Sequence, residues 1–515
     1  MGLVFSRPAA AAALPAPLPT LTIRNLTITP LELKLVERVD PHPHLHLHLH
    51  KPKTLAKAPP PPPPLAASSS GEQQEVTDIA LAPFSECRTP IPAPDPSSHH
   101  EQLHLTFEDP STGHRYSASI PSTSRRSIVL TPHPPKGSSS SFSSSLSSPE
   151  TKEFTAIYLP QHAFLALFSS ANLSSWMSTL LPSLPLTSLS IPGTHNSPTC
   201  HVALPSVRCQ VVPVPAQLAN GVRFFDVRVS SPIFSPTTTT PPELALVHSV
   251  FPISLTGPKH LAPLLSHLHA FLAAHPTETL LLSLKREGTG RGTDHDLSRI
   301  LHTHYITPSA SKWYTSPQIP TLAACRGRIV LVRRYRLDPS IPTDQGGIDG
   351  SVWPDNVADG TCGSGTIRIQ DYYGVNGGSD IHRKVRFAQE GLERAAAQTL
   401  RAVCGIHEAG GTEGGGVGAA GLPPHLPSPM PLFINFLSAS NFFNASCWPD
   451  RIAVKVNPSM IEYLCMGHGS PSNGSGLEVG DAATGIVVTD WVGNHGDWDL
   501  IRCIVGWNAR LQLRQ

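Results

Sequence analysis

Two histidines in the second half of the chain each stand at the end of an apolar run. They are His195 and His248, and Arg228 lies near the end of a further run between them. One imidazole can take a proton from a nucleophile while another gives a proton to a leaving group. A guanidinium can stabilise the negative charge that develops on a phosphate. These three residues therefore predict acid–base chemistry on a phosphate ester.

Other apolar runs also end in polar residues. These residues are Asn196, Asp226, Lys285, Arg334, Asp371, Tyr373 and Asp490. Taken singly, each is explained equally well by a strand that leaves the core for water. Taken together, they favour one shared pocket, provided that the runs carrying them end at the same edge of one sheet.

Eight apolar runs predict the strands that must bring these residues together. The runs are 186–191, 222–229, 244–250, 279–284, 328–332, 366–370, 432–436 and 485–489. Most are nearly continuous in Leu, Ile, Val and Phe, which is typical of parallel strands buried on both faces. Helices are predicted between several of them, at residues 261–274, 297–305 and 381–403.

The alternation of strands and helices indicates an α/β fold. Eight strands indicate a (β/α)8 TIM-type barrel, regular or distorted, over residues 175–515. The Gly- and Pro-rich segments 405–431 and 467–481 are expected to be surface loops of this barrel. In such a barrel the carboxyl ends of the strands converge on one open mouth, where we expect the polar residues to meet.

The first part of the chain has a different texture. Short alternating runs predict two strands within 20–40 and further strands at 76–83, 102–107, 115–120, 126–131 and 153–158. This spacing indicates a small, antiparallel, all-β sandwich over residues 20–160, preceded by a flexible arm at 1–19. Low-complexity segments at 41–72 and 133–152 interrupt it and are too polar or too rich in proline to pack a core.

One low-complexity segment carries alternating histidines at positions 42, 44, 46, 48 and 50. In an extended chain these side chains would share one face and could bind a metal ion. A solvated tract is the favoured interpretation, because such segments do not hold a fixed geometry.

Composition excludes several classes of protein. The 515 residues carry a net charge of +1, which gives no electrostatic attraction for nucleic acid. No apolar run reaches the ~18 residues that a membrane-spanning helix needs. Nine scattered cysteines without a CxxC pair suggest reduced thiols and an intracellular, cytoplasmic protein, in which the four Asn-x-Ser/Thr sequons would carry no glycan.

The first six residues, MGLVFS, fit the pattern for N-myristoylation of Gly2. An ordinary flexible arm explains the same residues. A single acyl chain gives only marginal membrane binding, so a second contact with the membrane would be needed.

The motifs around the polar residues resemble the catalytic X domain of the bacterial-type phosphatidylinositol-specific phospholipases C. The resemblance covers residues 183–515, and the motifs that carry it are IPGTHNS, GVRFFDVR, VH, TETLLLSLK, WPDN and INF. It implies an enzyme that cleaves phosphatidylinositol into diacylglycerol and inositol 1,2-cyclic phosphate. It also implies peripheral contact with a membrane, a monomer, and no cofactor or metal.

The resemblance implies a role for each candidate residue. His195 would be the general base, oriented by Asp490, and His248 the general acid. Arg228 would neutralise the phosphate, with Asp226 in the same polar cluster. The residues expected to bind the inositol ring are Lys285, Arg334, Asp371 and Tyr373.

Asn196 departs from the family, many members of which have Asp after the first histidine. An amide cannot share a proton as a carboxyl can, so the arrangement of the general acid is the least certain part of the resemblance. Two other functions stay open at this point. They are a metal-dependent glycerophosphodiester phosphodiesterase, which Arg228 and Lys285 disfavour, and an inositol-lipid-binding module without turnover.

Three aromatic residues follow the run 432–436 and are candidates for a rim that dips into the membrane. They are Phe442, Phe443 and Trp448. Core packing is the more frequent role of such residues and is the alternative.

Overall fold

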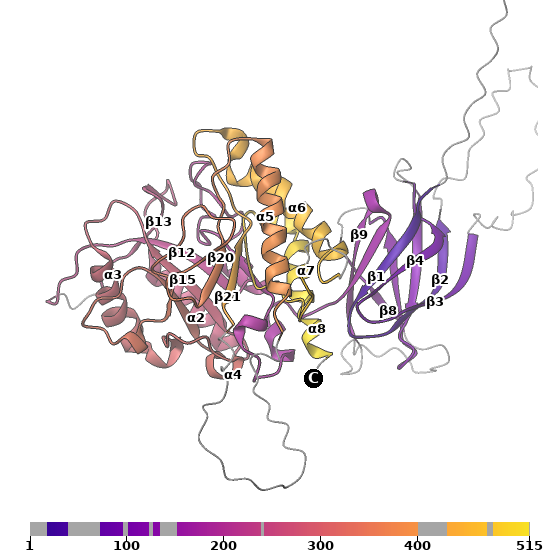
Figure 1. The fold of residues 1–515 in the computed structure, drawn as a ribbon, viewed down its shortest axis with the longest axis horizontal. Helices are drawn as coiled ribbons and strands as arrows, with labels where there is room; N and C mark the ends of the chain where they lie inside the picture. The colour runs from indigo at the N-terminus through magenta and orange to yellow at the C-terminus, as the bar shows by residue number, and fades with distance from the viewer. Residues whose placement is uncertain are drawn as a thin grey trace, which may run out of the picture.

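The chain forms two adjoining bodies, a β-sandwich and a larger α/β body (Figure 1). This computed structural model describes residues 18–39, 73–95, 101–122, 127–133, 152–237, 241–399, 430–470 and 477–513. Several expectations lie outside the described residues. They concern Gly2, the histidines at 42–50, loop 405–431, and nearly all of the low-complexity segments 41–72 and 133–152.

The β-sandwich consists of two five-stranded sheets. One has the order β4-β1-β10-β9-β7 and the other the order β3-β2-β5-β6-β8. The strands are β1 Thr20–Leu26, β2 Leu31–Val39, β3 Gln73–Leu81, β4 Ser85–Pro92, β5 Gln102–Glu108, β6 Arg115–Ile120, β7 Ser127–Val129, β8 Thr131–His133, β9 Phe154–Leu159 and β10 Phe164–Ser169. Inward residues such as Leu103, Leu105 and Phe107 are fully buried between the sheets, as the alternating pattern predicts.

The sandwich differs from its prediction in four respects. It contains two unpredicted strands, β4 and β10, and the predicted strand 126–131 is divided into β7 and β8, which lie in different sheets. β10 extends the body past residue 160, the predicted boundary. The sandwich is also not wholly antiparallel, because β1 pairs in parallel with β10.

The α/β body is built on a curled sheet. Seven of its strands run parallel in the order β17-β15-β12-β11-β22-β21-β20. They are β11 Ile191–Thr194, β12 Phe224–Ser230, β15 Leu280–Arg286, β17 Ile329–Arg334, β20 Ile367–Gln370, β21 Leu432–Phe436 and β22 Ile486–Thr489. Short strands flank them, namely β14 Phe251–Pro252, β16 Trp313–Tyr314, β18 Ile348–Asp349 and β19 Gly360–Thr361. In the described part of the chain, β17 and β20 at the ends of this row do not pair with each other.

Two of the eight predicted barrel strands were wrong in detail. Leu186–Ser188 forms a 3-10 turn, and the strand β11 begins only at Ile191. The predicted strand 244–250 is β13, Ala245–His248, which pairs antiparallel with β12. A parallel partner needs a crossover of about a dozen residues, usually a helix, and the proline-rich segment 231–244 cannot supply one.

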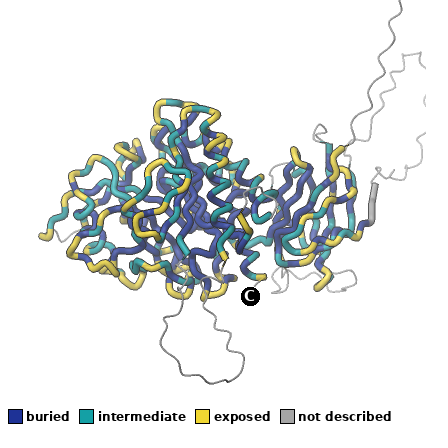
Figure 2. The backbone as a smooth tube through the Cα atoms, in the orientation of Figure 1, coloured by how far each residue is buried: buried dark blue, intermediate teal, exposed yellow. Residues whose placement is uncertain are grey.

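Helices cover the curled sheet and leave its apolar strands in the dark-blue interior of Figure 2. α2 spans Leu261–Ala274, as predicted. α3, Asp294–Ile300, starts earlier than predicted because Thr293 and Asp296 form a capping box. The other helices are α1 Val214–Ala219, α4 Leu322–Cys325, α5 Gly378–Ala396, α6 Pro449–Met466, α7 Asp499–Gly506 and α8 Ala509–Gln512. None of the helices in the described ranges is long and apolar enough to cross a bilayer.

The sandwich packs on helices α6 and α7 through a shared apolar cluster. Phe164 and Phe168 of β10 lie in one cluster with Ile504 and Trp507. The buried Arg24 of β1 donates hydrogen bonds to the carbonyl oxygens of Cys465 and His468, at 3.1 and 2.8 Å. Two carbonyl oxygens at the end of α6 therefore accept hydrogen bonds from a charged side chain of the sandwich. The interface thus combines apolar packing with directed hydrogen bonds.

His468 at this interface should make stability depend on pH. Burial lowers the pKa of this fully buried histidine to about 3. As the pH falls below 6.5, the unfolded chain takes up a proton that the folded His468 does not, so stability is lost down to the folded pKa. Moving from about pH 7.5 to about pH 5 should therefore cost the wild type about 2 kcal/mol more than His468→Gln. Urea unfolding followed by tryptophan fluorescence measures this difference, and the exposed-site variant His382→Gln should behave as the wild type does.

Candidate active site

The carboxyl ends of the parallel strands open on a pocket of about 760 Å³. Seven of the predicted site residues line it, namely His195, Arg228, His248, Lys285, Arg334, Asp371 and Tyr373. The other three, Asn196, Asp226 and Asp490, are buried and contact the lining residues. The structure thus brings all ten predicted residues together.

Three cations form a row along one edge of the pocket. Arg228 on β12 is in register with Lys285 on β15, and Lys285 is in register with Arg334 on β17. Neighbouring strands lie about 4.8 Å apart, so these side chains would repel one another without counter-charges.

Asp226 supplies one counter-charge from below the row. It lies two residues before Arg228 and is fully buried. Its Oδ2 accepts from Arg228, with the Nη2 atom at 3.2 Å, and its Oδ1 accepts from Arg334 Nη1 at 3.1 Å. Burial would raise the pKa of Asp226, but the charges of the two arginines outweigh burial and hold it well below its usual range. This carboxylate is therefore charged and fixes two guanidiniums.

Glu287 supplies the second counter-charge, and sequence reasoning gave it no role. Its Oε1 accepts from Arg228 Nη1 at 3.0 Å and from Lys285 Nζ at 2.7 Å, while its Oε2 accepts from the backbone N–H of Ser249 at 2.9 Å. Burial would raise the pKa of Glu287, but Arg228 and Lys285 lower it to about 2. Glu287 lies two residues after Lys285, directly past the end of β15. In extended backbone this spacing places both side chains on the same side, and it was the sequence feature that could have predicted their contact.

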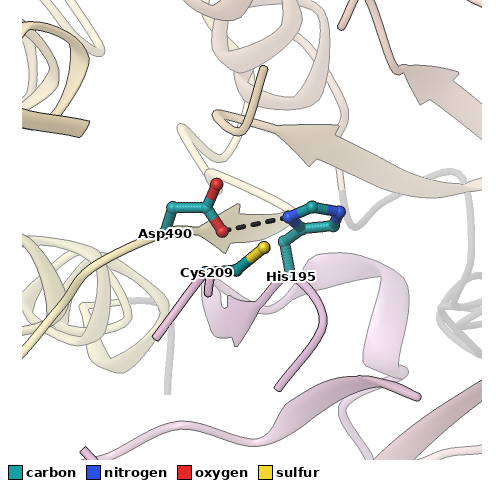
Figure 3. A group of neighbouring side chains, drawn as sticks. All are labelled: His195, Cys209 and Asp490. Carbon is teal, nitrogen blue, oxygen red and sulfur yellow. Dashed lines mark hydrogen bonds and ion pairs between the residues drawn. The ribbon is translucent and has the colours of Figure 1, made fainter. Parts of the chain in front are cut away.

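His195 and Asp490 form a hydrogen-bonded pair (Figure 3). Each is the first residue after its strand, and β11 and β22 pair in register, so the fold sets them side by side. The Nδ1 atom of His195 lies 3.0 Å from Asp490 Oδ1. Burial lowers the pKa of His195, but Asp490 and the sulfur of Cys209 outweigh burial and raise it to about 10. This imidazole therefore binds a proton more tightly than an ordinary histidine does.

Asn196 contacts the other ring nitrogen of His195. Its Nδ2 atom lies 3.0 Å from His195 Nε2, and its own Oδ1 has no hydrogen-bond partner. The residue has a φ of 42°, in the left-handed region that Asn and Asp tolerate better than most residues do. The amide can donate to a neutral imidazole, and after rotation it can accept from a protonated one. Asn196 thus suits both protonation states of His195.

His248 lies across the pocket from His195. The two rings are 6.0 Å apart between centroids and nearly perpendicular. His248 Nδ1 lies 2.7 Å from the carbonyl oxygen of Val207, which can only accept, so Nδ1 carries a proton. A backbone carbonyl therefore orients His248, and its Nε2 is left for other partners.

Cys209 lies between the two histidines, and sequence reasoning did not select it. Its sulfur is 3.8 Å from His248 Nδ1 and 3.9 Å from Asn196 Nδ2. Burial raises the pKa of this thiol, but the two imidazoles outweigh burial and lower it to about 7. Cys209 comes from the loop between β11 and α1, and its place beside His195 could not be inferred from strand positions.

Two aromatic residues complete the side of the pocket around Arg334 and Asp371. The ring of Trp353 lies over the Arg334 guanidinium, with 3.8 Å between the ring centroid and Arg334 Cζ. Trp353 also donates a hydrogen bond from Nε1 to Asp371 Oδ2 at 2.9 Å. Tyr373 donates from its hydroxyl to Asp355 Oδ1 at 2.8 Å. Trp353 therefore contacts both Arg334 and Asp371, two residues that were predicted to bind the inositol ring.

The rim of the pocket is aromatic. Phe443 is 95% exposed, and Phe442 stacks on Phe251 with 5.0 Å between the ring centroids. Trp448 is half-buried and donates to the carbonyl oxygen of Phe442 at 3.2 Å. For Phe442 and Phe443, the core alternative was therefore wrong.

The arrangement can bind one phosphate diester between two imidazoles. The cation row offers donors to the phosphate oxygens, one histidine can accept a proton, and the other can donate one. The pocket therefore holds the groups that acid–base cleavage of a phosphodiester requires.

Comparisons with known proteins point to the same chemistry. A 1-phosphatidylinositol phosphodiesterase of Listeria monocytogenes is 29% identical over 175 residues, which are 32% of this chain and 50% of that protein. The enzyme of the same name from Staphylococcus aureus (strain Newman) is 26% identical over 237 residues, 42% of this chain and 69% of that protein. The chain thus spans half the length of the first relative and about two thirds of the second. No family model matches the chain.

Solved structures similar to this chain include two bacterial enzymes. A structure of the phosphatidylinositol-specific phospholipase C of S. aureus has a TM-score of 0.48 and 21% identity, and the match covers 65% of this chain and 97% of that one. The Listeria enzyme has a TM-score of 0.45 and 19% identity, with 66% and 99% covered. The two curated relatives carry names that correspond to the family that the motifs resemble.

The two acids below the pocket should differ in their effect on stability. Asp226→Asn leaves two buried guanidiniums without their shared carboxylate, and we expect it to cost about 3–5 kcal/mol. Asp490→Asn should cost far less, because its partner His195 can become neutral by losing a proton. Urea unfolding of both variants measures the difference. Equal losses would contradict the assignment of Asp226 as the charge that fixes the cation row.

Proposed function

We propose that this protein is a phosphatidylinositol-specific phospholipase C that produces diacylglycerol and inositol 1,2-cyclic phosphate. One observation carries the proposal: His195, His248 and Arg228 line a single pocket, with the imidazole rings 6.0 Å apart. The similarity to bacterial 1-phosphatidylinositol phosphodiesterases supports the choice of substrate.

In the proposed reaction the inositol 2-hydroxyl oxygen attacks the neighbouring phosphorus. Nε2 of His195 takes the hydroxyl proton when the ring is neutral, while its Nδ1–H donates to Asp490. Because Asp490 and Cys209 raise the pKa of His195 to about 10, this reactive neutral form is the minor one in the free protein at neutral pH. The hydroxyl displaces the Asn196 amide from Nε2 as it binds. The imidazolium that forms lies against the Asp490 carboxylate, which stabilises its charge.

The bond between phosphorus and the diacylglycerol oxygen breaks as the new bond forms. Nε2 of protonated His248 gives its proton to the departing oxygen, and the Val207 carbonyl holds Nδ1–H throughout. Arg228 donates to the phosphate oxygens and stabilises their charge. An adjacent hydroxyl is an intramolecular nucleophile, which by itself can lower the barrier by about 7–11 kcal/mol.

The inositol ring would lie among Lys285, Arg334, Asp371 and Tyr373. Lys285 and Arg334 are donors and Asp371 is an acceptor, so the set can satisfy several ring hydroxyls. Tyr373 is 41% exposed and lines the pocket, where its ring can cover one face of the inositol. We propose that the reaction involves no metal ion, because Arg228 and Lys285 supply the positive charge that a hard cation supplies elsewhere.

We also propose that the curled sheet is a distorted TIM-type barrel that is open, over the described residues, between β17 and β20, and that the protein binds membranes peripherally as a monomer. A membrane substrate requires contact with a lipid surface, and the exposed Phe443 beside the pocket suits it. Acylation of Gly2 and a cytoplasmic location stay predictions.

Phosphorus NMR tests the reaction and the base together. With phosphatidylinositol in excess EDTA, the wild type should produce a cyclic inositol phosphate signal. His195→Ala should slow its appearance about 10³-fold, because the general base is lost. The control is His201→Ala, which removes a half-buried histidine that does not line the pocket and should leave the rate unchanged. A wild type without a signal, or a His195→Ala variant at full rate, would refute the proposal.

The aromatic rim gives a separate prediction. Phe443→Ser should weaken binding to phosphatidylinositol-containing vesicles by at least about tenfold, because an aromatic side chain that becomes buried in lipid contributes roughly 1.5–3 kcal/mol. Val129→Ser removes a 58%-exposed apolar residue of the sandwich and is the control. Vesicle sedimentation measures both. Equal binding by Phe443→Ser and the wild type would exclude the rim from membrane contact.

A further inference from the structure

Three side chains of different chemistry meet in the pocket wall. A ring nitrogen of His195, the Cys209 sulfur and an Asp490 oxygen all lie within 4.8 Å of one another, and Figure 3 draws the three side chains. The mechanism proposed above uses the first and the third but gives the sulfur no task. A nitrogen, a sulfur and a carboxylate oxygen together form a donor set that favours Zn²⁺ over hard cations.

We propose that this cluster is an inhibitory binding site for Zn²⁺ or a similar borderline-soft divalent cation. The cation would bind His195 Nδ1, the Cys209 thiolate and Asp490, and a fourth position would be open to water. Binding itself does not depend on the function of the pocket. Its inhibitory effect rests on the proposed function, since the cation would occupy the base and its orienting acid.

The geometry of the donors is close to what such a cation needs. Ligand atoms around tetrahedral Zn²⁺ lie about 3–4 Å apart. His195 Nδ1 and Asp490 Oδ1 are already 3.0 Å apart, and the sulfur requires a shift of less than about 2 Å to reach such a position. All three side chains are largely buried, with exposed fractions of 12% for His195 and 2% for Asp490.

Two buried atoms without partners point to the same conclusion. Among the residues that the structure describes, Asp490 Oδ2 has no hydrogen-bond partner, although the residue is 2% exposed. Within the same residues, Asn196 Oδ1 also has none. A cation on Nδ1 moves the ring proton to Nε2, where a rotated Asn196 amide would accept it through this oxygen. The orphaned Asp490 oxygen would become a second ligand atom or hold a metal-bound water.

The backbone fixes Cys209 in position. Its N–H donates to Thr199 Oγ1 at 3.1 Å, and its carbonyl oxygen accepts from the N–H of Trp491 at 2.9 Å. Trp491 follows Asp490 directly in the chain. Its hydrogen bond to Cys209 therefore ties the backbone that carries the thiol to the backbone that carries the carboxylate. The donor set is therefore organised before any cation binds.

Cobalt spectroscopy on the full-length, reduced protein tests the site itself. Co²⁺ bound to a thiolate gives a charge-transfer band in the near ultraviolet, whereas histidines at 42–50 can give none. We expect the band in the wild type and in Cys200→Ser, and its displacement by Zn²⁺. Cys209→Ser and Cys209→Ala should lack it. No band in the wild type, or an unchanged band in the Cys209 variants, would overturn the proposal.

Inhibition is measured in the same proteins with phosphatidylinositol vesicles. Zn²⁺ should inhibit the wild type and Cys200→Ser, and EDTA should restore their activity. In Cys209→Ala the half-inhibitory Zn²⁺ concentration should rise at least about tenfold, since one of three protein ligands is lost. An equal half-inhibitory concentration in all proteins would overturn inhibition through this site. A cobalt band in a wild type that cleaves no phosphatidylinositol would refute the proposed function and leave the metal site standing.

Discussion

The buried carboxylate of Asp226 is the interaction on which the pocket depends. It holds Arg228 and Arg334 at 3.2 and 3.1 Å from below, and Glu287 holds Arg228 and Lys285 from the side. Three cations and two carboxylates leave one positive charge in this cluster. Asp371 lines the same pocket and adds a further negative group near Arg228 and Arg334. The cations are therefore held in place by counter-charges and do not repel one another apart.

Much of this site could be predicted from the sequence because parallel strands align their ends. Once 222–229, 279–284 and 328–332 were identified as buried strands of one parallel sheet, their terminal cations had to lie at the same edge. The structure shows that these strands are neighbours. Cys209 and Glu287 could not be assigned in this way. Cys209 depends on the path of a long loop, and the role of Glu287 depends on which charges surround it. β13 was mispredicted because a short apolar run does not reveal its direction.

The β-sandwich shows which strands can be predicted from alternating apolar and polar residues and which cannot. Its β5 and β6 alternate between buried and half-buried or exposed residues and were predicted closely. β9 is buried at every position, and β10 at all but its last. Their sheet packs against the second sheet on one face and against the helices of the α/β body on the other. A strand covered on both sides has no polar face, so alternation marks neither β9 nor β10, and only β9 was predicted.

The sheet β4-β1-β10-β9-β7 contributes side chains to two apolar cores, one within the sandwich and one shared with the α/β body. Phe164 and Phe168 belong to the same apolar cluster as Ile504 and Trp507, and Arg24 satisfies carbonyls at the end of α6. A fragment beginning at residue 175 would lack Phe164 and Phe168 and would present Ile504, Trp507 and the buried His468 to water. The β-sandwich is therefore part of what keeps this face of the α/β body out of water.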